Sequence, residues 1–185
     1  MYFRDDCWTY SPSDLTTFMQ SPFGSWMDRF SLLNEEVNKH RDPNDALMAK
    51  LQQKGFSHED EVLRDLLKTK QVIDIAQTPH NGSNKLAAQS AATIEAMKAG
   101  VDVIFQAYLC DDPFRGYADF LVKVDGASSL GDFHYEVWDS KLASTVKPYF
   151  IIQLCCYAQM IEKIQHRLPQ HLTVVLGTKE EVKLK

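Results

Sequence analysis

Three charged side chains on two neighbouring predicted strands carry the chemistry that this sequence suggests. Asp139 and Lys141 stand two residues apart, and Asp119 lies about twenty residues before them. Residues two apart in a strand share one face, so Asp139 and Lys141 project together. Two carboxylates can hold a hard divalent cation, and a neighbouring lysine can orient water or stabilise charge on a phosphate. These residue types at this spacing predict metal-assisted cleavage of a phosphodiester bond.

An exposed strand face with a weak surface salt bridge is the alternative explanation of Asp139 and Lys141. However, large apolar residues flank the pair, which indicates a central strand: Val137, Trp138 and Leu142. Central strands seldom carry a buried charge without a partner or a function. We therefore expect Asp119 to lie level with Asp139 across a hairpin and to form a two-carboxylate oxygen site. Trp138 is expected in the core rather than as a stacking platform for a base.

Further polar residues lie where they can complete such a site. The Ser140 side chain is expected to point away from the carboxylates, while its carbonyl oxygen is free to act as a metal ligand. His58, near the start of a predicted helix, can offer an imidazole, although a lone histidine is more often a surface residue. Glu61 is an equally open candidate. Gln153 and Tyr157 share one helix face, from which they can contact a DNA backbone or hold the lysine, unless they are an ordinary surface pair.

The predicted element order is helices, then three strands, then a helix and a strand. Spacing and capping residues predict helices over six segments: 11–20, 23–33, 45–54, from 57 onwards, 85–98 and 148–168. Alternation and β-branching predict strands at 72–76, 101–109, 116–124, 134–142 and 171–176, with a hairpin connection at 125–132. Gly55 is expected to end one helix, and residues 34–44 to form a loop or short extension. The order predicts an α/β (α+β) fold with a mixed central β-sheet flanked by helices.

Composition limits the class of protein. The 185 residues are 44% hydrophobic and 24% charged, which favours one soluble globular domain over residues 1–185. No run approaches the roughly 20 apolar residues that span a bilayer, and the first residues lack a secretory signal. We therefore expect a cytoplasmic location and no membrane. The net charge of −5 argues against tight, non-specific DNA binding by this chain alone.

Four cysteines are present without any CxxC spacing, so a zinc site has little support: Cys7, Cys110, Cys155 and Cys156. The adjacent pair is expected at buried helix positions. Residues 180–185 directly follow a strand-like run. We therefore hypothesise that the chain is the N-terminal part of a longer protein, or that it packs on a partner.

Taken together, these segments resemble the RecB-like branch of the PD-(D/E)XK nuclease superfamily. The resemblance covers most of the chain, in the order 11–15, 55–58, 116–119, 139–141 and 153–157. Each motif is short, but their order and the spacing of the carboxylates are fairly specific. The resemblance implies a restriction-endonuclease-like core and a metal-dependent nuclease acting on DNA, with a place in DNA repair or recombination.

The resemblance also implies a role for each matching residue. Mg²⁺ or Mn²⁺ would be held by four residues: His58, Asp119, Asp139 and, through its carbonyl, Ser140. Lys141 would position the attacking water or stabilise the developing charge. Gln153 and Tyr157 match the family's QxxxY element, which lines the DNA path.

Similar nucleases cut single-stranded or end-exposed DNA, often as modules attached to helicases, so a helicase domain or partner is implied. Several also carry an iron–sulfur cluster, bound by one early and three late cysteines. Here Ser21 and Pro22 stand where the early Cys-Pro is expected, and the late cysteines are absent, so we expect no cluster. The alternative function is a catalytically weak scaffold, or a DNA-binding module of a helicase–nuclease assembly.

Overall fold

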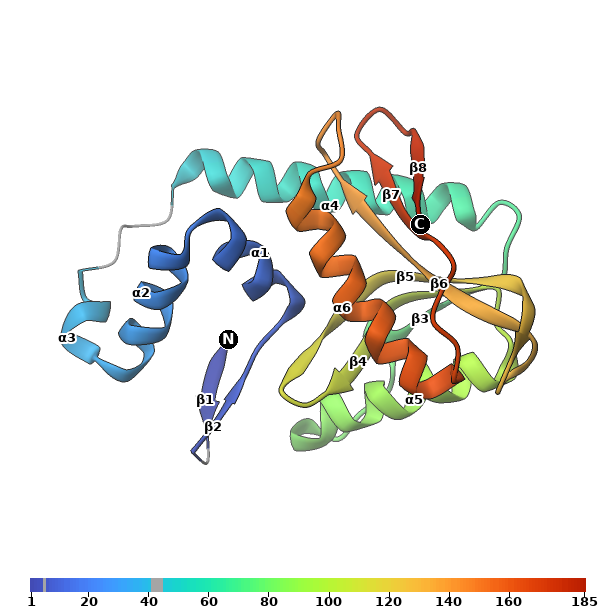
Figure 1. Ribbon diagram of the computed structural model, residues 1–185, viewed down its shortest axis with the longest axis horizontal. Coiled ribbons are helices and arrows are strands. Elements are labelled where there is room, and N and C mark those ends of the chain that lie inside the picture. Colours follow the sequence, from blue (N-terminus) through green and yellow to red (C-terminus); the bar gives the residue numbers. More distant parts are fainter. Residues whose placement is uncertain (5, 41–44) are drawn as a thin grey trace.

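The expected mixed sheet flanked by helices is present in the computed structural model, which describes residues 1–4, 6–40 and 45–185 (Figure 1). The sheet has six strands in the order in which they occur along the chain: β3 (Val72–Asp74), β4 (Val103–Asp111), β5 (Phe114–Ser128), β6 (Gly131–Lys141), β7 (Leu172–Leu176) and β8 (Glu181–Leu184). Strands β3 and β4 are parallel, as are β6 and β7, and the other neighbours are antiparallel. The long β5–β6 hairpin forms the middle of the sheet.

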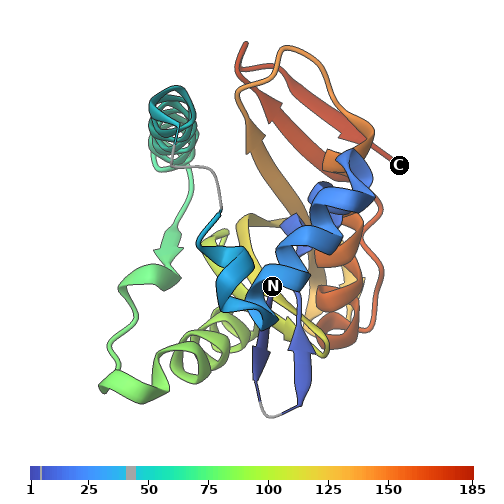
Figure 2. The same ribbon diagram turned by 90° about the vertical axis from the view of Figure 1, so that its left-hand side faces the viewer.

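Helices cover both faces of this sheet. A smaller core lies between α4 (Ala46–Leu66) and one face, and it contains Val62, Phe105, Phe120, Trp138 and Val175. A larger core lies on the other face, where α5 (Lys85–Ala99) and α6 (Pro148–Gln165) supply residues such as Met97, Leu154 and Ile161. In Figure 2, α4 is viewed along its axis and lies on one side of β6 and β7, whereas α6 lies on the opposite side. Trp138 therefore belongs to the core, as expected.

The N-terminal segment packs against α6 through a short helix. Strands β1 (Tyr2–Arg4) and β2 (Cys7–Thr9) form a small hairpin, followed by α1 (Pro12–Gln20), α2 (Pro22–Leu33) and α3 (Glu35–Asn38). Helix α1 lies along α6. The backbone amide of Ser11 donates to Asp14 Oδ2 over 2.7 Å, which fixes the start of α1. Ser21 Oγ accepts from the amide of Gly24 over 2.9 Å and begins α2, so the predicted break falls where expected.

Several predicted boundaries were wrong. Helix α4 runs unbroken through Gly55, because one glycine inside a long run of good helix formers costs only about 1 kcal/mol. Strands β5 and β6 continue into the predicted connection at 125–132, with a register shift between Asp125 and Ser128. Strands β1, β2 and β8, each three or four residues long, were not predicted. Within 34–44, α3 is the short extension, and residues 41–44 lie outside the described part.

Two smaller expectations concern the cysteines and the membrane. All four cysteines are free thiols, but Cys155 is exposed, so only Cys156 of the adjacent pair is buried. Among the described helices, none has both the length and the apolar character to cross a bilayer.

Candidate active site

The central hairpin opens at the level of the two predicted carboxylates. Pairing of β5 with β6 begins at Phe120 and Trp138 and continues toward the turn of the hairpin. The next residues in the opposite direction are Asp119 and Asp139, where the two strands separate. We call this point of separation the fork. Beyond the fork, β6 stays paired with β7 as far as Lys141. The expectation that Asp119 lies level with Asp139 is confirmed by this register.

Asp119 fills the fork with its side chain. Its Oδ2 accepts the backbone amide of Ser140 over 2.9 Å and the hydroxyl of Ser140 over 3.2 Å. The Ser140 amide therefore donates to this carboxylate in place of a backbone carbonyl of β5. The bond links β5 to β6 where their backbone pairing has ended. The expectation that the Ser140 side chain points away from both carboxylates is wrong for Asp119, because the strands have separated there.

Asp139 and Lys141 form a buried ion pair. The Lys141 Nζ atom lies 2.8 Å from Oδ1 and 2.6 Å from Oδ2 of Asp139, so the two side chains project together as expected. Asp139 is only 2% exposed, whereas the lysine remains partly open to solvent. The ammonium also lies 5.6 Å from the centre of the Phe150 ring on α6. The lysine is thus held over the larger-core face of the sheet.

A third carboxylate, Glu59, approaches the fork from α4 and was missed by the sequence reasoning. It accepts a hydrogen bond from the Gln106 amide on β4. The signal was present in the sequence, because Glu59 lies three, four and seven residues before Val62, Leu63 and Leu66. A carboxylate on the apolar stripe of a helix faces the core and requires a partner there.

The charges at the fork perturb one another. Burial raises the pKa of Asp139 to about 7, the charge of Asp119 adds to the rise, and Lys141 opposes it. Burial and then Asp119 likewise raise the pKa of Glu59 to about 7, against the hydrogen bond from Gln106 and the charge of Lys141. Burial alone would lower the pKa of Lys141, but Asp139 and Asp119 outweigh it and raise that pKa. The cluster therefore has more acids than bases and keeps its lysine charged.

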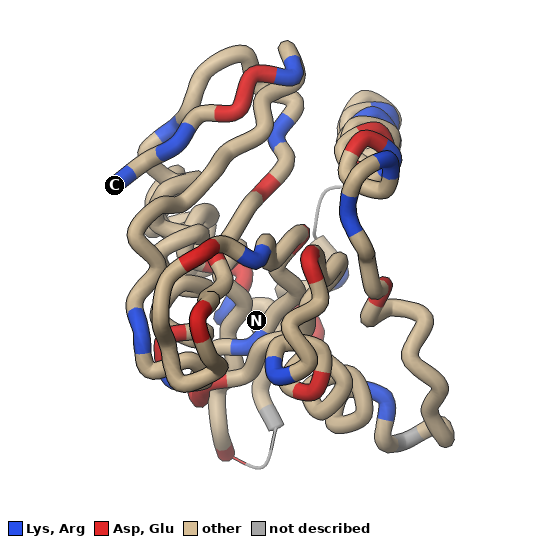
Figure 3. Tube along the Cα trace, turned by 90° about the vertical axis from the view of Figure 1, so that its right-hand side faces the viewer, with Lys and Arg blue, Asp and Glu red and all other residues tan. Residues whose placement is uncertain are grey.

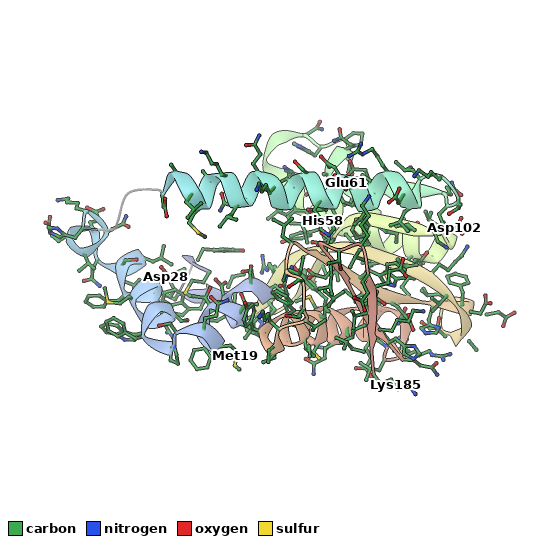
Figure 4. All side chains as sticks on the ribbon, turned by 90° about the horizontal axis from the view of Figure 1, so that it is seen from above. Met19, Asp28, His58, Glu61, Asp102 and Lys185 are labelled. Atoms are coloured by element: carbon green, nitrogen blue, oxygen red, sulfur yellow. The ribbon has the colours of Figure 1, made fainter. Side chains whose placement is uncertain are left out.

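His58 is buried on the side of α4 that faces the strands (Figure 4). Its Nε2 donates to the carbonyl oxygen of Val175 on β7 over 3.2 Å. This bond places the proton on Nε2, so a metal could reach His58 only through Nδ1. The geometry gives His58 a role in fastening α4 to β7, and its role as a ligand stays a prediction. Glu61 instead faces Lys179, 3.3 Å away.

Tyr157 is buried behind the site. Its hydroxyl donates to the carbonyl oxygen of Tyr117 on β5 over 2.6 Å, and Gln153 hydrogen-bonds to the same tyrosine. Burial raises the pKa of Tyr157, and the charges of Asp119 and Asp139 raise it further. This pair supports β5 just before Asp119, while contact with DNA stays a prediction for both residues.

The donor set at the fork fits a magnesium-like ion only in part. Among the described residues, no three His, Cys, Asp or Glu side chains converge closely enough to hold a metal by themselves. Magnesium, however, is commonly bound by one or two carboxylates together with waters and substrate phosphate. All-oxygen donors and mutual repulsion between Asp119, Asp139 and Glu59 suit a hard cation of that kind.

Comparisons with known proteins leave the family of this chain open. The sequence matches no protein-family model, and it matches no curated protein. The resemblance to RecB-like nucleases and the restriction-endonuclease-like assignment therefore stay predictions from the motifs.

Proposed function

We propose that this chain is a divalent-metal-dependent nuclease that hydrolyses phosphodiester bonds of DNA. One observation carries the proposal: the fork between β5 and β6 places Asp119, the buried Asp139 and Lys141 together, and α4 adds Glu59. Three carboxylates with one lysine leave an excess of negative charge in a mostly buried place. Such an arrangement is costly unless a cation binds there.

The chain's own residues divide the work of the proposed reaction. Asp119 and Asp139 would hold Mg²⁺ or Mn²⁺, with Glu59 and the Ser140 carbonyl nearby. The bound ion would supply a Lewis acid for a phosphate oxygen and favour deprotonation of water. Lys141 keeps its proton, because the neighbouring acids raise its pKa. Its Nζ can therefore donate hydrogen bonds to a water or to a phosphate oxygen that gains charge.

The charge distribution favours a substrate held locally rather than by a broad basic surface. Figure 3 shows Lys and Arg interleaved with Asp and Glu along the chain. This is consistent with single-stranded DNA or DNA with free ends, and with a helicase domain or partner that delivers it. We place this activity in the cytoplasm, where the four free thiols would stay reduced.

Cleavage of labelled single-stranded and duplex DNA tests the proposal. We expect cutting with Mg²⁺ or Mn²⁺, none with EDTA, and near-total loss in Asp119→Ala, Asp139→Ala and Lys141→Ala. Lys163→Ala is a matched control, because Lys163 pairs with Asp111 over 2.7 Å at the surface. Unchanged activity in any two of the three site variants would refute the assignment.

A nuclease-fold scaffold with weak or absent catalysis is the second candidate. The observation in its favour is that Asp139 already has Lys141 as a partner and that, within the described part of the chain, no complete ligand set converges. Calorimetric titration with MnCl₂ separates the two, because a scaffold has no need for the ion. Binding that is lost in Asp139→Asn supports the nuclease, and absence of binding in the wild type supports the scaffold.

A further inference from the structure

Gln106 has an unusual backbone conformation for a residue in the middle of a strand. Its φ angle is +51°, in the left-handed region that non-glycine residues rarely occupy. The pairs Phe105–Phe120 and Ala107–Ala118 lie on either side of it, so Gln106 stands opposite Asp119. Together with Asp139, these residues form one row across β4, β5 and β6. The strained residue therefore lies in the row that contains both carboxylates.

The conformation of Gln106 changes which face of the sheet β4 presents. Ile104 and Ala107 both belong to the larger core although they are three residues apart, which a regular strand does not allow. Phe105, between them, belongs to the smaller core under α4. In a regular strand, Gln106 would share the face of Ile104. The left-handed backbone conformation of Gln106 directs its side-chain amide to the other face of the sheet, toward Glu59 on α4.

The contact with Glu59 is specific in its chemistry. The Gln106 Nε2 atom donates to Glu59 Oε1, a charge-assisted bond when the carboxylate is ionised. Glu59 also follows His58, which is bonded to β7 over 3.2 Å. Two successive residues of α4 are thus bonded to β4 and β7, on either side of the fork. Glu59 is thereby held toward Asp119, whose charge it feels.

We propose that Gln106 is a positioning residue, whose left-handed backbone conformation serves to hold Glu59 beside the two carboxylates of the cation site, Asp119 and Asp139. This inference rests on the proposed function. Strained backbone persists where the surrounding structure requires it, and it often marks functional sites. A glutamine suits the task because its amide donates to a carboxylate without adding charge to an acidic cluster.

Two substitutions take the amide out of reach of Glu59 without disturbing the backbone. Asparagine and glycine both accept positive φ at low cost, so Gln106→Asn and Gln106→Gly keep the turn but lose the reach to Glu59. We expect each to weaken MnCl₂ binding roughly five- to tenfold, which is the loss expected for one ordinary hydrogen bond. Gln52→Asn, at an exposed position on α4, is the matched control and should bind like the wild type. Calorimetry measures the affinities, and thermal melting confirms folding.

A double-mutant cycle separates positioning from a general structural effect. If Gln106 acts through Glu59, Gln106→Gly should change nothing further in a Glu59→Ala background. Losses that multiply in the double variant would overturn the inference, as would wild-type affinity in both Gln106 variants while Asp139→Asn abolishes binding. If wild type and Asp139→Asn are alike in binding no Mn²⁺, the proposed function fails and the inference with it.

Discussion

At the scale of single residues, the fork combines burial with an unbalanced charge. Asp139 is nearly inaccessible and has one cation beside it, yet Asp119 and Glu59 add two more carboxylates. Removing a charge from water is expensive, and one lysine offsets only part of that expense. Protonation near neutral pH relieves the repulsion in the metal-free protein. A divalent cation would relieve it without protonation.

This balance predicts how metal-free stability depends on pH. The pKa of Asp139 is raised on folding, from about 4 to about 7, so the folded state binds more protons than the unfolded state between these values. The free energy of unfolding should therefore fall as pH rises from about 4 to about 7, and Glu59 adds to the fall because its pKa is also raised to about 7. The contribution of one proton is at most about 1.4 kcal/mol per pH unit. Urea unfolding at several pH values in EDTA measures this slope.

The variant Asp139→Asn isolates the contribution of this carboxyl. It should lessen the fall between about pH 4 and 7, because asparagine has no proton to release and only the part due to Glu59 remains, whereas Asp132→Asn at an exposed position of β6 should leave the slope unchanged. Equal slopes in wild type and Asp139→Asn would show that the Asp139 carboxyl does not titrate in this range.

At the scale of elements, the site depends on a close contact between α1, α6 and β5. Gly116 lies where this contact is tightest: a Cβ placed on it would meet Tyr157 Oη at 2.7 Å and Pro12 Cδ at 2.9 Å. The bare backbone lets the Tyr157 hydroxyl reach the Tyr117 carbonyl. Glycine is thus required here for close approach, three residues before Asp119.

Gly116→Ala should destabilise the protein by about 1–3 kcal/mol, because the tyrosine or α1 must move. Gly55→Ala is the matched control, since a Cβ at Gly55 meets nothing within 4 Å in the middle of α4. The control should stabilise by about 0.5–1 kcal/mol through helix propensity. Chemical denaturation of both variants measures the two effects. Destabilisation by Gly55→Ala, or none by Gly116→Ala, would contradict this account of the two glycines.

Helix α4 combines an anchored half with an unsupported one. Residues 46–57 are exposed except for the half-buried Gly55, whereas His58 and Val62 are buried against the sheet. Hydrogen exchange should therefore be at least about tenfold faster in the first half than in the second, because local opening there exposes little apolar surface. Mass spectrometry of exchanged peptides measures this. Uniform protection along α4 would show that an unseen contact stabilises its first half.

These elements also show what the sequence could and could not predict. Period-two spacing was enough to place Asp139 beside Lys141, and the hairpin was enough to bring Asp119 level with them. Glu59 could have been found from the apolar stripe of α4, because the helix predicted from residue 57 onwards already contains that stripe. The left-handed turn at Gln106 has no sequence signal, because glutamine has no preference for it. The short β8 depends on pairing with β7, which is a tertiary effect.

At the scale of the whole molecule, the acidic balance limits how DNA can be held. The net charge is −5, and acidic and basic residues alternate along the chain (Figure 3). Affinity from a basic surface releases many counterions and is therefore steeply dependent on salt. Under the proposed function, a chain of this kind would hold a phosphate mainly through a bound cation and a few local donors such as Lys141. A partner or further domain would then supply most of the affinity for longer DNA.

The cation requirement and the salt dependence can be measured together. Single-stranded DNA labelled with fluorescein should bind weakly in Ca²⁺ and hardly at all in EDTA, because the carboxylates at the fork repel phosphate without a cation. The slope of log K against log NaCl should be shallower than about −2, as for a few phosphate contacts. Fluorescence anisotropy gives both quantities, with Asp139→Asn as the variant that should lose the Ca²⁺ dependence. Tight binding in EDTA with a steep slope would place the DNA on another surface of the molecule.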